Sequence, residues 1–183
     1  MHKDIKEILY TEEEIAARVR EIGGELTDKY SKIVDEGGSV VLVSVLRGAA
    51  IFMADLARAT EFPIEMDYMA LSSYGSGTKS SGTVKIVKDL TASIEGKHVI
   101  VAEDILDSGL TLQFLLEYLK GRKPASVEVV TLLRKLAKAQ APIECAHVGF
   151  ECPDEFIVGY GLDYAERYRN LPYIGVLKPE VYA

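Results

Sequence analysis

The feature that most constrains the fold is an apolar run that ends abruptly in polar residues. The run is Val99–Ala102, and carboxylates, hydroxyls and a glycine follow it directly. They are Glu103, Asp104, Asp107, Ser108, Gly109 and Thr111. An apolar run that ends in turn residues is typical of a buried strand. Residues 110–120 then carry leucines at helical spacing, at positions 112, 115, 116 and 119. The polar residues are therefore expected on a strand-to-helix turn, where open parallel sheets usually bind ligands.

The predicted turn has the groups that bind a monoester phosphate. Free backbone N–H groups at a helix start, including that of Leu110, favour a phosphate. The hydroxyls of Ser108 and Thr111 add further donors. Gly109 lets the backbone approach a ligand closely. We therefore expect a phosphate cradle here.

The three carboxylates of the same stretch have separate expected roles. Adjacent side chains of an extended strand point to opposite faces. We expect the backbone to turn at the end of the strand, so that Glu103 and Asp104 both reach a ribose diol or, directly or through water, a magnesium ion. Asp107 stands at the lip of the cradle, where it can accept a proton from a substrate nitrogen. The alternative is that Asp107 only caps the helix and the other acids are solvated.

The rest of the chain alternates between helix and strand patterns. Thr11 and Glu14 form a capping-box signature at the start of a long helix that ends at Gly37-Gly38 and is a candidate for interruption at Gly23-Gly24. Residues 49–59 form a second predicted helix. Further strands are predicted at residues 40–46, 64–71, 84–88, 127–133, 147–150 and 173–177. The pattern predicts a single α/β domain over residues 1–183, with a mostly parallel central sheet flanked by helices. A small hood is expected from about residue 156 to 183, with the N-terminal segment as a further candidate contributor.

The stretch at residues 72–83 differs from its surroundings, because it consists of serine, glycine, threonine, tyrosine and lysine with almost nothing to bury. Such loops inside compact domains are usually lids or binding loops. The other interpretation is a plain linker between the strands at residues 64–71 and 84–88. We favour the lid, because a plain hairpin needs only about two to five residues.

Composition narrows the class of protein. A formal net charge of −7 argues against a broad nucleic-acid footprint. No apolar run approaches the ~18 residues that span a bilayer, and the N-terminal residues lack the apolar core of a signal peptide. A cytoplasmic location is therefore expected. Cys145 and Cys152 fit no zinc pattern and are expected to be reduced thiols.

At this point the residues resemble a known family. Glu-Asp-Ile-Leu-Asp-Ser-Gly-Leu-Thr at 103–111 resembles the phosphoribosyl-pyrophosphate motif of the type I phosphoribosyltransferases. Four other stretches, in order along residues 40–177, resemble elements of the hypoxanthine-guanine branch of that family. They are Val45–Gly48 for the pyrophosphate loop, Leu71–Gly75 for the mobile catalytic loop, and Leu132–Lys135 and Phe156–Tyr164 for the purine site.

The resemblance implies an activity in purine salvage, with Mg²⁺ as cofactor. A purine base, hypoxanthine or guanine, attacks the anomeric carbon of phosphoribosyl pyrophosphate and yields IMP or GMP plus pyrophosphate. Asp107 resembles the general base, and Ser73 and Tyr74 belong to the mobile loop. Glu103 and Asp104 resemble the ribose-diol and metal ligands. Small-molecule substrates, no nucleic acid or membrane, and a homodimer or homotetramer are the implied partners.

The remaining implied roles concern pyrophosphate and the base. Arg47 and Gly48 correspond to the pyrophosphate loop, often with a cis peptide after Leu46, and Arg169 corresponds to a pyrophosphate-binding position on the hood. Lys135 donates to the exocyclic oxygen of a 6-oxopurine, which disfavours adenine. Phe156 stacks on the base, Ile157 presents backbone groups to its edge, and Asp163 is a further magnesium ligand.

Plainer structural interpretations compete with several of these roles. Arg47 is otherwise an ordinary salt-bridge residue, Phe156 a core aromatic and Asp163 a turn residue after Gly161. For Arg169, the neighbouring Arg167 is a rival.

Two other functions compete with the main one. One is a xanthine- or guanine-preferring phosphoribosyltransferase, against which the 156–163 stretch argues. The other is an RNA-binding regulator of the same fold, which needs a basic surface that a charge of −7 does not suggest.

Overall fold

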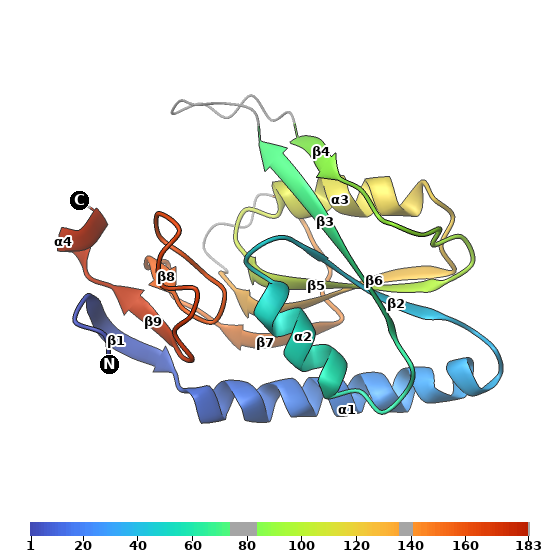
Figure 1. Cartoon of the computed structure of the whole chain (residues 1–183), viewed down its shortest axis with the longest axis horizontal. Coiled ribbons are helices and arrows are strands. Elements are labelled where there is room, and N and C mark those ends of the chain that lie inside the picture. Colours follow the sequence, from blue (N-terminus) through green and yellow to red (C-terminus); the bar gives the residue numbers. More distant parts are fainter. Residues whose placement is uncertain (74–83, 136–140, 183) are drawn as a thin grey trace.

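A six-stranded sheet lies at the centre of the computed structural model, which describes residues 1–73, 84–135 and 141–182 (Figure 1). The strand order is β4-β3-β2-β5-β6-β7, and only the β3–β4 pair is antiparallel. The strands are β2 (Val40–Val45), β3 (Glu65–Ser73), β4 (Val84–Lys88), β5 (His98–Leu106), β6 (Ser126–Arg134) and β7 (His147–Glu151). The predicted α/β fold with a mostly parallel sheet is confirmed.

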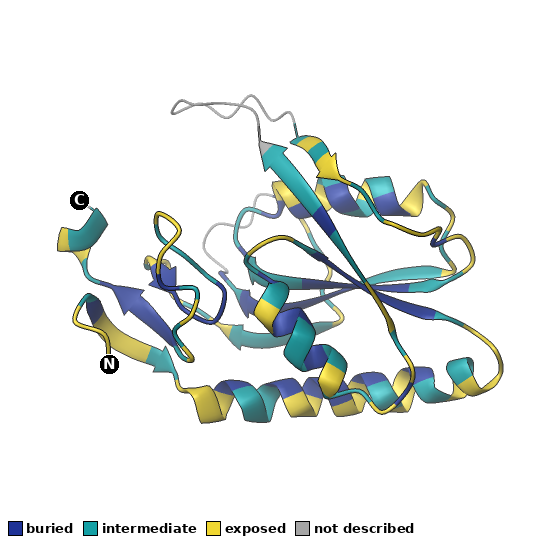
Figure 2. Ribbon diagram, viewed as in Figure 1, coloured by how far each residue is buried: buried dark blue, intermediate teal, exposed yellow. Residues whose placement is uncertain are grey.

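Helices cover both faces of this sheet, as Figure 1 shows. They are α1 (Glu12–Asp35), α2 (Ala50–Arg58) and α3 (Leu110–Lys120). On β2, Leu42 belongs to the apolar cluster under α1 and α2, whereas Val41 and Val43 belong to the cluster under α3. Because both faces of the central strands are buried, their sequences are continuously apolar rather than alternating (Figure 2).

The long first helix forms as predicted and runs without a break. Its capping box is complete, with Thr11 Oγ1 accepting from the Glu14 N–H and the Glu14 carboxylate accepting from the Thr11 N–H. The expected candidate interruption at Gly23-Gly24 is wrong. Gly23 instead allows a close approach to α2, because a Cβ there would lie 2.5 Å from the Cβ and carbonyl oxygen of Ala59.

The central strand β5 is longer than expected, which corrects the position of the acidic pair. Glu103 and Asp104 lie within the strand, and only Asp107–Gly109 form the turn. Side chains of a regular strand point alternately to its two faces, but this alternation is broken between Ala102 and Ile105. Val101 packs on the α3 side and Ala102 on the opposite side, yet Ile105 packs with the α1 and α2 cluster and Leu106 with the α3 cluster.

A second sheet forms the hood. It consists of β1 (Ile5–Tyr10), β9 (Ile174–Leu177) and β8 (Ile157–Val158), in the order β1-β9-β8, and the short helix α4 (Pro179–Tyr182) follows it. The strand at β1 was not predicted by the sequence pattern. Figure 1 shows both chain ends beside this sheet, to one side of the central one.

The predicted loop at residues 72–83 is only partly described. Ser72 and Ser73 pair with Lys85 and Val84, so they extend the strands rather than open a loop. The choice between lid and linker falls on residues 74–83, which lie outside the described residues. Among the described residues, no helix is long and apolar enough to cross a membrane.

Candidate active site

A cavity of about 410 Å³ lies between the carboxyl end of the central sheet and the hood. Five of the residues predicted to bind or react with a substrate line it. They are Asp107, Lys135, Phe156, Ile157 and Asp163. They come from the β5–α3 turn, the end of β6, the start of β8 and the hood loop, so the fold brings residues from distant parts of the chain to one space.

Asp107 lies at the junction of this cavity with a smaller one of about 140 Å³. Its Oδ1 is buried and has no hydrogen-bond partner among the described residues. A buried carboxylate oxygen without a donor is costly unless a ligand satisfies it. The helix-cap alternative is wrong, because Gly109 is the N-cap of α3 and no side chain caps that helix.

The smaller cavity has the composition expected of a phosphate cradle. Ser108, Gly109 and Thr111 line it together with Glu103. Gly109 has a φ of 80°, a left-handed conformation that glycine adopts without strain. The N-cap Gly109 has no side chain to cap α3, and the Leu110 N–H makes only a long 3.5 Å contact with Ser108 Oγ, so the first N–H groups of the helix can bind an anion.

The surroundings of the two adjacent carboxylates of β5 disfavour their ionised forms. Burial and the charge of Asp104 raise the pKa of Glu103 well above its ordinary value. Burial also raises the pKa of Asp104, although the N–H of Ile105 and the charge of Arg169 oppose this. Asp104 packs so closely on Gly48 that a Cβ there would lie 1.8 Å from its Oδ2. Both groups would therefore be stabilised by a cation or by hydroxyl donors.

The hood loop faces these carboxylates with its own charged network. Arg169 Nη1 donates to the Gly161 carbonyl at 2.8 Å, and its Nη2 lies 2.9 Å from Asp163 Oδ1. Asp163 Oδ2 also accepts from the Glu166 N–H at 2.9 Å, so it shapes the turn as well as facing the cavity. Arg167 is exposed and pairs through its backbone with Tyr164.

Arg47 joins the β2–α2 turn to the same loop. The peptide bond between Leu46 and Arg47 is cis. The Arg47 guanidinium donates to Glu166 at 2.6 Å, and both side chains are largely exposed. The salt bridge named as the plainer interpretation is therefore present, and a contact of Arg47 with pyrophosphate stays a prediction.

Lys135 is a cation directed into the cavity from the end of β6. Its side chain is only 9% exposed, and its Nζ donates to the Glu155 carbonyl at 2.9 Å and lies 3.6 Å from Asp154 Oδ1. The backbone N–H of Lys135 donates to the Leu106 carbonyl, which ties it to β5. Arg134 next to it pairs instead with Glu151 on β7. A ligand oxygen in the cavity would meet a preplaced ammonium group.

Phe156 is not a core aromatic, because 38% of its surface is exposed. Its ring stacks on Tyr182 with centroids 4.9 Å apart and meets Tyr164 edge-on at 5.3 Å. Ile157 beside it is buried. Tyr182 and Leu162 also line the cavity and were not given a role, although Leu162 lies in the 156–164 stretch that resembles a purine-binding element; Tyr182 lies in no pattern that marks a binding residue.

The roles expected of Ser73 and Tyr74 in the catalytic loop stay predictions. Ser73 ends β3, and Tyr74 lies outside the described residues. The two cysteines are free, as predicted, and burial raises the pKa of Cys152 to about 11.

The residues fit a magnesium ion that arrives with its substrate. Among the described residues, no three acids, histidines or cysteines are grouped as a ready metal site. Mg²⁺ is often held by one or two carboxylates together with substrate phosphates and water. Glu103 and Asp104, with raised pKa values beside a phosphate-sized cavity, provide that kind of partial site.

Comparison with known proteins agrees with this geometry. Residues 7–165 match the family model described as a phosphoribosyl transferase domain. The chain is 55% identical over 183 residues to the bifunctional protein TilS/HprT of Listeria monocytogenes. It spans 28% of the length of the Listeria relatives that it matches.

Two further proteins match over nearly their whole length. The hypoxanthine-guanine phosphoribosyltransferase of Bacillus subtilis is 53% identical over 182 residues, which are 100% of this chain and 98% of that protein. The crystal structure of a hypoxanthine phosphoribosyltransferase from Staphylococcus aureus superposes with a TM-score of 0.93 at 51% identity. The match covers 100% of this chain and 97% of that one.

Proposed function

Because this chain belongs to the hypoxanthine-guanine phosphoribosyltransferases of the phosphoribosyl transferase domain family, we propose that it is a purine salvage enzyme. It transfers the phosphoribosyl group of phosphoribosyl pyrophosphate to hypoxanthine or guanine, and IMP or GMP and pyrophosphate leave. One observation carries the assignment of the site. Asp107, whose buried Oδ1 has no hydrogen-bond partner among the described residues, and Lys135 line one cavity beside a phosphate-sized pocket.

The two polar groups of the cavity suit the two edges of a 6-oxopurine. Lys135 donates to the exocyclic oxygen, and Asp107 takes the proton that the ring nitrogen loses as it attacks. An amino group in place of the oxygen would give Lys135 no acceptor, so adenine is disfavoured. Phe156 supplies an aromatic face for the base, and Ile157 supplies backbone groups at its edge.

The sugar phosphate occupies the smaller cavity. Ser108, Leu110 and Thr111 donate to the 5′-phosphate, and Gly109 lets the backbone approach it. Glu103 and Asp104 accept from the ribose diol. Positive charge that develops on the ribose is stabilised by these carboxylates, whose own charge is poorly solvated in the free protein.

The leaving pyrophosphate lies between the β2–α2 turn and the hood. Arg169 and the backbone at Arg47 and Gly48 bind it. When bound, Mg²⁺ offsets part of its negative charge, with Glu103, Asp104 and Asp163 as the residues that hold the ion. Ser73 and Tyr74 shield the reaction from water. Action in the cytoplasm as a homodimer or homotetramer completes the proposal.

A steady-state assay tests the function directly. The protein is supplied with phosphoribosyl pyrophosphate, Mg²⁺ and, in turn, hypoxanthine, guanine, xanthine and adenine, and nucleotide formation is followed. We expect IMP and GMP to form and AMP not to form. Failure to use both hypoxanthine and guanine would contradict the proposal, and preferential use of xanthine would favour the related xanthine-preferring activity.

A further inference from the structure

The last described residue of the chain reaches the cavity that we assign to the purine. Tyr182 lines this cavity together with Phe156 and Lys135. Its ring is stacked on Phe156, with centroids 4.9 Å apart and planes 27° apart. Tyr164 meets the Tyr182 ring edge-on at 6.4 Å, so three aromatic rings contact one another at this wall.

The chain between Phe156 and Tyr182 holds the two rings together. The Leu177 N–H donates to the Phe156 carbonyl at 2.8 Å, which fixes the end of β9 beside the start of β8. Lys178 then donates to the Asp4 carbonyl, and Pro179 begins α4. Proline is favoured at the first position of a helix because its missing N–H has no partner to lose there. One turn later, Tyr182 is back over Phe156.

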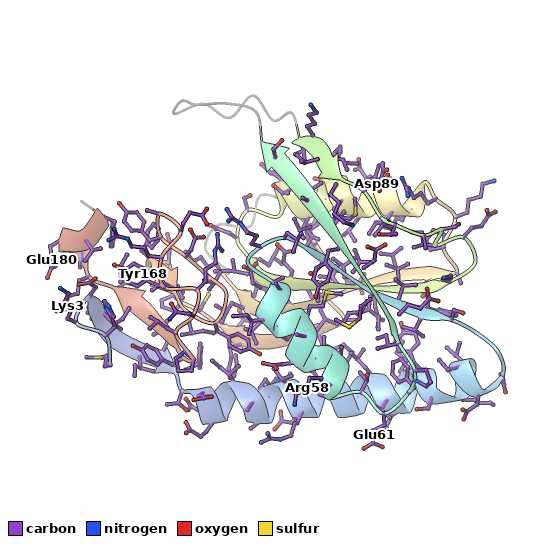
Figure 3. The ribbon with its side chains drawn as sticks, in the orientation of Figure 1. Lys3, Arg58, Glu61, Asp89, Tyr168 and Glu180 are labelled. Atoms are coloured by element: carbon purple, nitrogen blue, oxygen red, sulfur yellow. The ribbon has the colours of Figure 1, made fainter. Side chains whose placement is uncertain are left out.

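The position of Tyr182 is not explained by core packing alone. Val181 and Tyr182 both pack against the small apolar cluster that includes Ile5 and Leu177, while Glu180 on the same helix is exposed (Figure 3). Tyr182 keeps partial exposure and borders the cavity. Within the described residues its hydroxyl has no hydrogen-bond partner. The ring, rather than the hydroxyl, is therefore the part that contributes.

We propose that Tyr182 is a positioning residue for the purine base, which it holds by bracing the Phe156 ring and extending the aromatic wall of the cavity. This inference rests on the function proposed above. A base that stacks on Phe156 needs that ring in one orientation, and Phe156 is too exposed to be fixed by the core. Stacking by Tyr182 removes the ring's freedom before the base arrives, which lowers the entropic cost of binding.

The first test separates binding of the base from chemistry. We expect Tyr182→Ala to raise the KM for hypoxanthine about three- to tenfold, the loss expected for one aromatic pair. The kcat and the KM for phosphoribosyl pyrophosphate stay near wild type, because Asp107 and the phosphate cradle are untouched. Tyr182→Phe should restore the wild-type KM. Glu180→Ala is the matched control on the same helix and should change nothing.

Each other outcome has a definite meaning. An active wild type with an unchanged KM in Tyr182→Ala would overturn the inference but leave the function intact. A KM that falls would also overturn it, because Tyr182 would then block the base rather than support it. A fall in kcat that Tyr182→Phe does not restore would also overturn it, because Tyr182 would then support the fold in general and not the base. A wild type that forms no IMP would contradict the proposed function itself.

A second measurement does not depend on turnover. The sequence has no tryptophan, so Tyr182→Trp creates a single tryptophan beside the proposed base. We expect saturating IMP to change its emission, and AMP at the same concentration to have a much smaller effect. An emission that stays constant while equilibrium dialysis shows IMP bound would rule out Tyr182 as part of the base site.

Discussion

The carboxyl end of β5 and the hood loop at residues 159–169 hold their charged side chains by different means. β5 pairs with β2 as far as Ala102 and with β6 through Leu106, so the ladder to β6 carries its acidic end. The hood loop has little regular pairing and four non-glycine residues with positive φ. They are Tyr160, Ala165, Glu166 and Tyr168. The sheet thus positions the charged side chains of β5, whereas residues with positive φ position those of the hood loop.

The two regions also differ in how their charges are compensated. Asp163 in the hood has Arg169 at 2.9 Å and the Glu166 N–H as partners. Glu103 on β5 has a raised pKa, and Asp107 has an unpartnered oxygen. The hood carboxylate Asp163 is thus compensated before any ligand binds, whereas Glu103 and Asp107 are not, although the buried Nε of Arg169 also has no hydrogen-bond partner among the described residues. Substitutions should therefore affect chemistry at β5 and folding in the hood.

The largest effect is expected at Asp107, where a substitution should lower the rate of the reaction without lowering the stability of the fold. Asp107→Ala should lower kcat about a thousandfold, because general-base catalysis contributes on the order of 10²–10⁴. The melting temperature should stay at or above wild type, since the lost Oδ1 has no partner among the described residues. IMP binding should largely survive. An unchanged kcat would show that Asp107 is not the proton acceptor. A large loss of stability would show that a substitution at the β5 end affects folding, as one in the hood is expected to do.

The next effect should be on folding, in the hood. Gly161 has a φ of 103°, and a Cβ there would lie 2.0 Å from the Gly48 carbonyl oxygen. Gly161→Ala should therefore cost about 3 kcal/mol of unfolding free energy, which lowers the melting temperature by roughly 6–12 °C in a chain of this size.

A glycine elsewhere gives the matched control. Gly24 in α1 has nothing within 4 Å of an added Cβ. Gly24→Ala should raise stability by about 0.5–1 kcal/mol, because alanine is the better helix former. Equal melting temperatures for Gly161→Ala and Gly24→Ala in differential scanning calorimetry would show that the stability of the hood does not depend on the positive φ at Gly161.

The same contrast explains which parts of the molecule could be predicted from sequence. The helix at 110–120 was predicted with its observed limits, because burial on one face leaves a regular leucine pattern. The end of β5 was placed too early, at Ala102. Acidic side chains interrupt the apolar pattern that marks a strand, yet the backbone ladder to β6 continues through Leu106. Hydrogen bonding there is independent of side-chain polarity.

The hood was harder to predict, because little in its local sequence reports its structure. β1 at Ile5–Tyr10 lacks a regular alternation, since Ile5 is buried, Leu9 and Tyr10 are half-buried and Ile8 is exposed, and it is held by pairing with β9 far along the chain. Tyr182 gave no signal for the same reason, since its contact with Phe156 is long-range. Conversely, Lys135, Phe156 and Asp163 were placed in one site through resemblance to a family, and the cavity contains all three.

A moderate effect is expected at Lys135, which joins the two regions through Leu106 on one side and Glu155 on the other. Lys135→Met keeps the length of the side chain and removes the donor. The KM for hypoxanthine should rise about thirtyfold, since hydrogen bonds to charged groups contribute about 1.5–3 kcal/mol. The discrimination against adenine should fall in the same assay. A variant that retains wild-type KM values would exclude Lys135 from recognition of the 6-oxo group.

The smallest expected effect tests the electrostatic half of the comparison, through the stability of the free protein. Because the pKa of Glu103 is raised in the folded state, its ionised form destabilises the fold relative to the unfolded chain. The cost is therefore largest above the raised pKa, becomes smaller as the pH falls below it, and is lost only below the ordinary pKa of the unfolded side chain. Glu103→Gln removes that charge. It should stabilise the protein by about 1 kcal/mol at pH 8, or roughly 2–4 °C.

The gain from Glu103→Gln should become smaller as the pH is lowered from 8 toward 5, because wild-type Glu103 becomes protonated below its raised pKa. Asp163→Asn in the hood is the matched control with the opposite sign. It weakens the contact with Arg169 and should lower the melting temperature at pH 8. Thermal melts from pH 5 to 8, without Mg²⁺ or substrate, give both values. If both variants lowered the melting temperature by similar amounts, Glu103 would be satisfied like Asp163, and the β5 end would need no ligand to compensate its charge.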